Sequence, residues 1–192
     1  METPLSLLER LRTAPDEASW QRLDDIYRPL VGRWLLPWQS LQGETEDVVQ
    51  DVLTILIREL PTFERERKGS FRSWLRTITA HRALAYHRSL QRQPQAVGAV
   101  LEACPLALLH DPNSELSRRW DEEHDQYVLR RLLELIEPLF EKTTLAAFRR
   151  VVFDEVEAAW VAEELGISLA AVWLAKSRVL KALRQEAKGL ID

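Results

Sequence analysis

Residues 161–185 read VAEELGISLAAVWLAKSRVLKALRQ, which is two helical patterns separated by a short turn. Gly166 favours a left-handed helix stop, and Ser168 is a good N-cap for the helix that follows. A short helix, a tight glycine turn and a second helix predict a helix-turn-helix. Helical spacing places one set of side chains inward, namely Val172, Ala175, Val179 and Leu183. The outward set is Ala170, Leu174, Ser177, Arg178 and Lys181, with Trp173 on the flank.

A helix with such an outward face can enter a DNA major groove, where residues near its start contact bases and lysines and arginines bind phosphates. Helical hairpins with a glycine turn are also common structural units. From this pattern alone, DNA binding and a purely structural hairpin both stay open.

A second informative pattern precedes Pro61. Thr45 can cap a helix that runs from Glu46 to Leu60. One stripe of this helix is apolar and consists of Val49, Val52, Leu53, Leu56 and Leu60. The opposite face carries Glu44, Asp47, Asp51, Thr54 and Arg58, with Gln50 at its edge. The helix is therefore expected to pack with one face and to present carboxylates with the other.

Further helical patterns cover residues 19–36, 71–88 and 114–140. Periodicity fades between residues 91 and 113, where four helix breakers occur, with room for a short apolar turn at residues 100–109. We expect an all-α fold of two small helical domains, residues 1–90 and 114–192, joined by a flexible linker at residues 91–113.

The composition of the 192 residues excludes several classes of protein. Hydrophobic residues make up 46% and charged residues 29%, which is too apolar for a disordered chain and too charged for a membrane bundle. The small number of glycines, 6 in all, disfavours a turn-rich β fold. The single cysteine excludes an internal disulfide framework. The N-terminus shows neither a signal peptide nor a spanning helix, so we expect a cytoplasmic protein without membrane insertion.

The net charge of −4 hides two basic islands. Residues 64–92 hold 8 Lys and Arg against 2 Asp and Glu, and residues 166–192 hold 5 against 2. A polyanion such as DNA would be attracted to these islands and repelled by the rest of the chain. Two solvated arginine-rich helix faces would give the same counts, so charge alone does not decide between the two interpretations.

Two blocks of the sequence resemble one family in the expected order. Residues 46–52, EDVVQDV, followed by Leu60, Phe63 and residues 69–78, GSFRSWLRTI, look like sigma region 2. Residues 161–168, with residues 171–173 and 175–180, look like sigma region 4. The chain thus resembles an extracytoplasmic-function (ECF) sigma factor of the bacterial sigma-70 family. The resemblance covers most of the chain outside the linker.

The resemblance implies roles for the residues that match. The polymerase-binding residues would be Asp47, Gln50 and Asp51, which would dock on the clamp helices of the polymerase β′ subunit. Phe63 and His81 would form a pocket for one flipped base of the minus-ten element, with His81 at the usual asparagine position. Phosphates of the separating strands would be bound by Arg65, Arg67, Lys68, Arg72, Arg76, Arg82 and Arg88. Trp74 fits either core packing, which its spacing favours, or bracing of unpaired bases.

The helix-turn-helix would contact the minus-thirty-five element through Ser168, Ala170, Ala171, Trp173, Leu174, Ser177, Arg178 and Lys181. Trp173, Leu174 and Ala175 replace polar or basic residues that are often found there, which points to apolar contact and groove shape in base readout. The implied partners are core RNA polymerase, including its β flap, promoter DNA, and an anti-sigma factor or another regulatory partner. No cofactor, metal or catalytic residue is expected.

Two other classes of protein compete with this interpretation. A helix-turn-helix regulator that binds an operator without polymerase would leave the acidic helix unexplained. An enzyme of the helical-bundle type would have to recruit His81, His87, His110 and His124, none of which pairs at a ligand spacing with carboxylates on one face.

Overall fold

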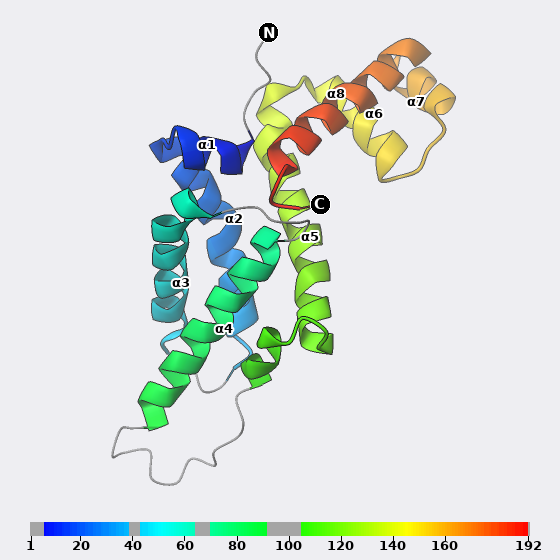
Figure 1. The fold of residues 1–192 in the computed structure, drawn as a ribbon. Helices are drawn as coiled ribbons and strands as arrows, with labels where there is room; N and C mark the ends of the chain where they lie inside the picture. Colours follow the sequence, from blue (N-terminus) through cyan, green and yellow to red (C-terminus); the bar gives the residue numbers. More distant parts are fainter. Residues whose placement is uncertain (1–5, 39–42, 64–69, 92–104, 192) are drawn as a thin grey trace.

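The computed structural model describes residues 6–38, 43–63, 70–91 and 105–191, and these residues form an all-α fold (Figure 1). The α-helices are α1 (Leu7–Thr13), α2 (Glu17–Leu35), α3 (Thr45–Glu59), α4 (Ser70–Gln91), α5 (Glu115–Ile136), α6 (Lys142–Val152), α7 (Ala158–Leu165) and α8 (Leu169–Ala187). Short 3₁₀ helices are η2 (Leu60–Thr62), η4 (Pro105–His110) and η5 (Glu137–Leu139). The predicted fold class is confirmed.

The helices begin where their sequences supply caps. Ser6 and Glu9 form a reciprocal capping box at α1, and Asp16 accepts a hydrogen bond from the Ser19 amide at α2. Ser114 caps α5 in the same way through the Ser117 amide. These local bonds satisfy amides that have no partner inside the helix.

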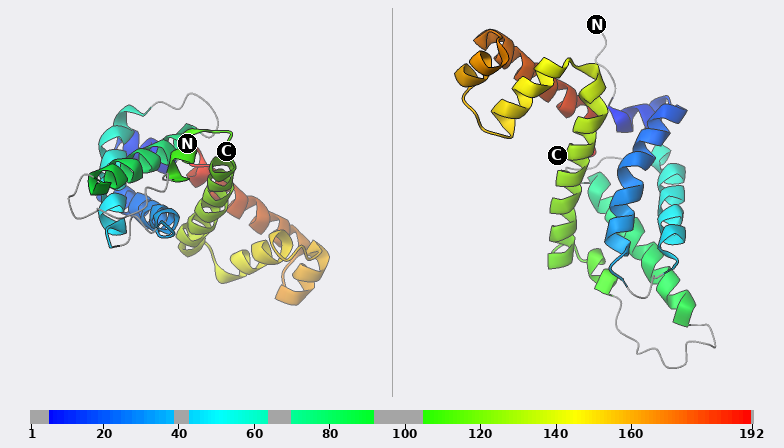
Figure 2. Two further views of the ribbon diagram at one scale, coloured as in Figure 1. Left: turned by 90° about the horizontal axis from the view of Figure 1, so that it is seen from below. Right: turned by 180° about the vertical axis from the view of Figure 1, so that it is seen from behind.

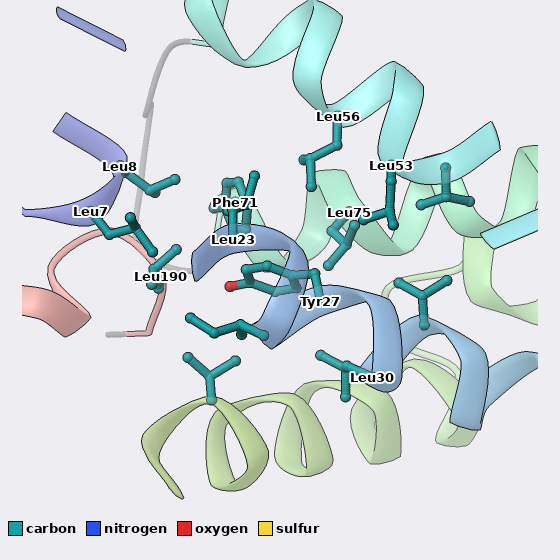
Figure 3. Packing of buried hydrophobic residues seen from close by; sticks show 14 of the residues in the cluster. Leu7, Leu8, Leu23, Tyr27, Leu30, Leu53, Leu56, Phe71, Leu75 and Leu190 are labelled. Atoms are coloured by element: carbon teal, nitrogen blue, oxygen red, sulfur yellow. The ribbon is translucent and has the colours of Figure 1, made fainter. Parts of the chain in front are cut away.

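The larger of two hydrophobic cores lies among α1–α5 and reaches the C-terminal end of α8 (Figure 3). The middle of α2 supplies Leu23, Tyr27 and Leu30, which pack between α3, α4 and α5. The predicted apolar stripe of α3 is fully buried here. Burial of this many large apolar side chains is the main stabilising contribution to the body that carries α3 and α4.

The smaller core lies among α6, α7 and α8. It joins Ala147 of α6 with residues of α7 and α8. In both Figure 1 and the right view of Figure 2, α6, α7 and the start of α8 extend to one side of the α1–α5 body. The end of α8 returns to that body, where Leu190 lies beside Leu7 and Leu8 (Figure 3).

Three expectations differ in detail from the structure. Thr45 does not cap α3, because the N-cap position is Glu44 and no side chain bonds there. The helix expected at residues 114–140 ends at Ile136, since Pro138 lies in the 3₁₀ turn η5 that follows. The short apolar turn falls at η4, and Leu109 of that turn is buried.

The division into residues 1–90 and 114–192 stays a prediction. The packing adds that α5, which follows the expected linker, shares the larger core with α2 and α4. The linker residues 92–104 lie outside the described residues.

Among the described helices, none is long and apolar enough to cross a membrane by itself. Helices α7 and α8 meet that criterion only when they are taken together, and they are bent by 105° at the turn between them.

Candidate functional site

The exposed face of α3 is acidic, as the sequence predicted. Asp47 is exposed and makes no ion pair with any described residue. The side chain of Asp51 is 67% exposed, with its Oδ2 at 3.8 Å from Arg82 Nε of α4. Gln50 is exposed, and its Oε1 accepts a 2.9 Å hydrogen bond from Arg28. These three side chains are therefore presented to solvent on one helix face.

Arg28 of α2 organises the edge of this acidic face. Its guanidinium donates to Asp24 at 2.9 Å, and it also pairs with Glu46 and Gln50 of α3. The hydrogen bond with Asp24 is the largest cause that raises the pKa of Arg28 above its ordinary value. Sequence analysis missed Arg28, because contacts 18 and 22 residues away leave no local pattern.

An aromatic cluster lies where η2 meets α4. Phe63 is half-buried and stacks on Trp74 with ring centroids 4.7 Å apart and an angle of 23°. Both rings meet the edge of the buried Phe71, with centroid distances of 5.7 Å in each case. The geometry favours a packing role for Trp74. The predicted phosphate-binding residues Arg65, Arg67 and Lys68 lie outside the described residues.

The later turns of α4 carry three of the predicted minus-ten residues, His81, Arg82 and Arg88. His81 and Arg88 are exposed, and Arg82 is half-buried beside Asp51. The His81 ring lies 4.5 Å from the ring of His110 in η4. Burial, followed by electrostatic interactions with His81 and Arg88, lowers the pKa of His110.

Two predicted phosphate-binding residues at the start of α4 already have carboxylate partners on α5. Arg76 Nη1 lies 2.5 Å from Asp121 Oδ1, and the Arg76 side chain is only 4% exposed. Arg72 pairs with Asp125, and its Nε lies 3.4 Å from Asp121. The Arg72 side chain is 20% exposed. The i, i+4 spacing of Asp121 and Asp125 was the sequence signal for an acidic stripe on α5, which was not singled out.

The turn between α7 and α8 has the predicted glycine conformation and the predicted serine N-cap. Gly166 adopts a left-handed conformation with φ 64°, and the Ser168 hydroxyl accepts a hydrogen bond from the Ala171 amide at 3.1 Å. The 105° bend falls in the range of a helix-turn-helix. All four residues predicted to face inward on α8 are buried.

The outward face of α8 is exposed along its length. Exposed positions are Ser168, Ala170, Trp173, Leu174, Ser177, Arg178 and Lys181, whereas Ala171 is half-buried. Trp173 is 50% exposed, with Lys176 Nζ at 5.4 Å from its ring centre. Trp160 of α7, 65% exposed, was not singled out by the sequence analysis. The structure therefore brings together an apolar start and a basic middle on one helix.

Within the described ranges, no group of three or more His, Cys, Asp or Glu side chains could hold a metal ion. The arrangement instead offers three separate surfaces. These are the acidic face of α3, the aromatic and basic face of α4, and the outward face of α8.

Comparison with known proteins matches residues 23–93 to the family model of sigma-70 region 2. The matched segment contains most of α2 and all of α3, together with α4, and so includes two of the three surfaces. This match identifies a segment similar to sigma-70 region 2 and supports a role in polymerase binding and promoter melting. No curated protein matches the chain.

Proposed function

We propose that this chain is an RNA polymerase sigma factor of the ECF type, which binds core polymerase and directs promoter recognition, DNA melting and initiation. One observation carries the proposal: a sigma-70 region 2 match over α2–α4 occurs in the same chain as the helix-turn-helix α7–α8. A melting module and a duplex-reading module in one small chain is what promoter recognition requires.

The acidic face of α3 would dock on the clamp helices of the polymerase β′ subunit. Asp47 and Asp51 are exposed, so a basic partner can reach them without any change in the fold. Charges of this kind steer association and set the orientation of the complex. Gln50, held by Arg28, would add a positioned hydrogen-bonding group beside them.

The face of α4 would hold the minus-ten element as single strands. Extruding a base costs stacking energy, which contacts to the extruded base and to the strand phosphates offset. His81 is exposed on α4 and is available to a flipped base, and the half-buried Phe63 would offer the accessible part of its ring. Arg82 and Arg88, with the basic residues of the preceding loop, would bind phosphates.

The outward face of α8 would read the minus-thirty-five element. Arg178 and Lys181 are exposed for contacts with bases and phosphates, and Trp173 and Leu174 offer apolar contact with thymine methyl groups. This half of the chain would also contact the polymerase β flap. An anti-sigma factor or another regulatory partner would restrain activity by covering one of the three surfaces.

A pull-down with bacterial core RNA polymerase tests the proposal. We expect retention of the wild-type chain and its loss in Asp47→Lys/Asp51→Lys, because the reversed charges repel the basic partner. Glu122→Lys/Glu141→Lys is a control with the same charge change at exposed positions outside α3, and it should be retained. Failure of the wild-type chain to bind at low salt would favour an operator-binding regulator instead.

A further inference from the structure

The start of α4 is covered by α5. Asp121 and Asp125, one turn apart on α5, pair with the guanidinium groups of Arg72 and Arg76 (helices in Figure 1). His124, between them in sequence, is fully buried and contacts Asp125 Oδ1 through Nδ1 at 2.9 Å. Its ring lies 5.8 Å from that of Tyr27 on α2. The position of Asp125 is thus fixed by the packing beneath it.

Carboxylate and phosphate oxygens are equivalent partners for an arginine guanidinium. Donors that bind Asp121 and Asp125 are not free to bind a DNA strand. Arg76, at 4% exposure, cannot meet a phosphate at all while α5 is in place. We propose that Asp121 and Asp125 form an acidic cover that competes with promoter phosphates for Arg72 and Arg76, so that α5 must leave α4 before the minus-ten element is fully bound.

The geometry of a promoter requires the same separation. The two elements lie about 25 base pairs apart, which is about 85 Å on straight B-DNA. A compact chain of this length has a radius of gyration of only about 16 Å. The unit that carries α8 must therefore move away from α4 if both elements are bound at once. Helix α5 is connected to that unit through η5 and α6. When α5 moves away from α4 together with that unit, Arg72 and Arg76 become uncovered.

In the closed state, in which α5 covers α4, the larger core joins α5 to α2 and α4, and ion pairs join α8 to α1. At the end of α8, Arg10 of α1 pairs bidentately with Glu186 at 3.2 and 2.8 Å, and Lys188 pairs with Glu9 at 2.6 Å. Leu190 is buried beside Leu7 and Leu8 of α1.

An open surface cleft of about 570 Å³ lies beside the α2–α5 interface and is lined by Arg33 and Trp38 on the α2 side and by Tyr127 and Arg130 on α5.

The proposal rests on the proposed function, and DNA binding without polymerase tests it. The probe is a labelled forked fragment with a single-stranded minus-ten region, measured by fluorescence anisotropy at 0.15 M salt. Asp121→Asn/Asp125→Asn removes the carboxylate charges and leaves the buried Arg76 cation without an anionic partner, which disfavours the closed state. We expect at least about tenfold tighter binding than wild type.

The control is Glu115→Gln/Glu122→Gln, which removes two exposed carboxylates from the same helix. It changes the net charge equally, so its affinity gain measures general electrostatics and should stay within about threefold. Equal gains in the two variants would overturn the proposal. If the wild-type chain binds core polymerase and both variants gain equally, only the acidic cover fails, and the proposed function stands.

A reversible lock provides a second test. A Cβ at Gly189 would lie 4.0 Å from the Cβ of Leu8, which suits a disulfide. Leu8→Cys/Gly189→Cys in a Cys104→Ser background ties the end of α8 to α1 when oxidised. The strain of a side chain at φ 90° is present in both redox forms and cancels in the comparison. With core polymerase, we expect the oxidised form to give less than a tenth of the promoter-dependent transcript of the reduced form. Equal transcription would overturn the proposal.

Discussion

Replacement of Leu190 with alanine tests the closed state without changing any charge. Leu190 is 1% exposed and packs against α1 beside Leu7 and Leu8 (Figure 3). Buried Leu→Ala substitutions cost about 2–5 kcal/mol, and we take the lower value because neighbours at the end of a helix can relax into the space. A loss of about 2 kcal/mol corresponds to a shift of about 30-fold in the ratio of closed to open chains.

The assay is the affinity for the forked minus-ten fragment. When the closed state dominates, the apparent dissociation constant is the intrinsic value divided by the open fraction. Leu190→Ala should therefore bind up to about 30-fold tighter than wild type. Leu36→Ala removes a leucine that is 67% exposed and serves as the matched control, with no expected change in affinity.

Urea unfolding of the same variants separates the gating role of Leu190 from a merely structural one. A lower unfolding free energy together with an affinity within about twofold of wild type would refute the reasoning. In that case the packing of Leu190 stabilises the fold, but it does not limit access of DNA to α4.

Three further outcomes are expected. Arg178→Ala should weaken binding to duplex minus-thirty-five DNA by about 1–3 kcal/mol and make the affinity less dependent on salt, as measured by anisotropy at two salt concentrations. Unchanged binding would show that Arg178 does not contact DNA. Gly166→Ala should lower the unfolding free energy by about 1–2 kcal/mol in chemical denaturation, because a side chain at φ 64° strains the backbone. A steric clash does not contribute, since a Cβ at this position meets nothing within 4 Å. A neutral effect would contradict the backbone argument. Burial lowers the pKa of His124 despite the opposing contact with Asp125. The unfolded chain therefore binds a proton at His124 more readily than the folded chain does. The free energy of unfolding should fall as the pH drops below about 6.5, by at most about 1.4 kcal/mol per pH unit. Urea unfolding at pH 7.5 and 5.5 should show a smaller loss for His124→Leu than for wild type, and an equal loss would exclude His124 as its source.

Much of the candidate site was predictable because it depends on one helix at a time. The period of 3.6 residues separated the buried stripe of α3 from Asp47 and Asp51, and the structure shows the same two faces. Gly166 and Ser168 placed the turn between α7 and α8 for equally local reasons, a left-handed conformation and an N-cap.

Errors arose where local signals compete. Thr45 is a good cap by type, but the helix already includes it, and Glu44 occupies the cap position without a side-chain bond. Trp74 could not be assigned from spacing alone, because both a core ring and an exposed ring fit the period of α4. Its stacking on Phe63 emerged only when η2 was packed against α4.

The sequence by itself determined most of the helical segments and which face of each is polar, since these follow from hydrogen bonds and side-chain directions within a few residues. Only the tertiary structure decided that Arg72 and Arg76 have carboxylate partners 53 and 45 residues away on α5. Such pairs depend on how whole helices pack and cross, and no pattern within either helix encodes that geometry.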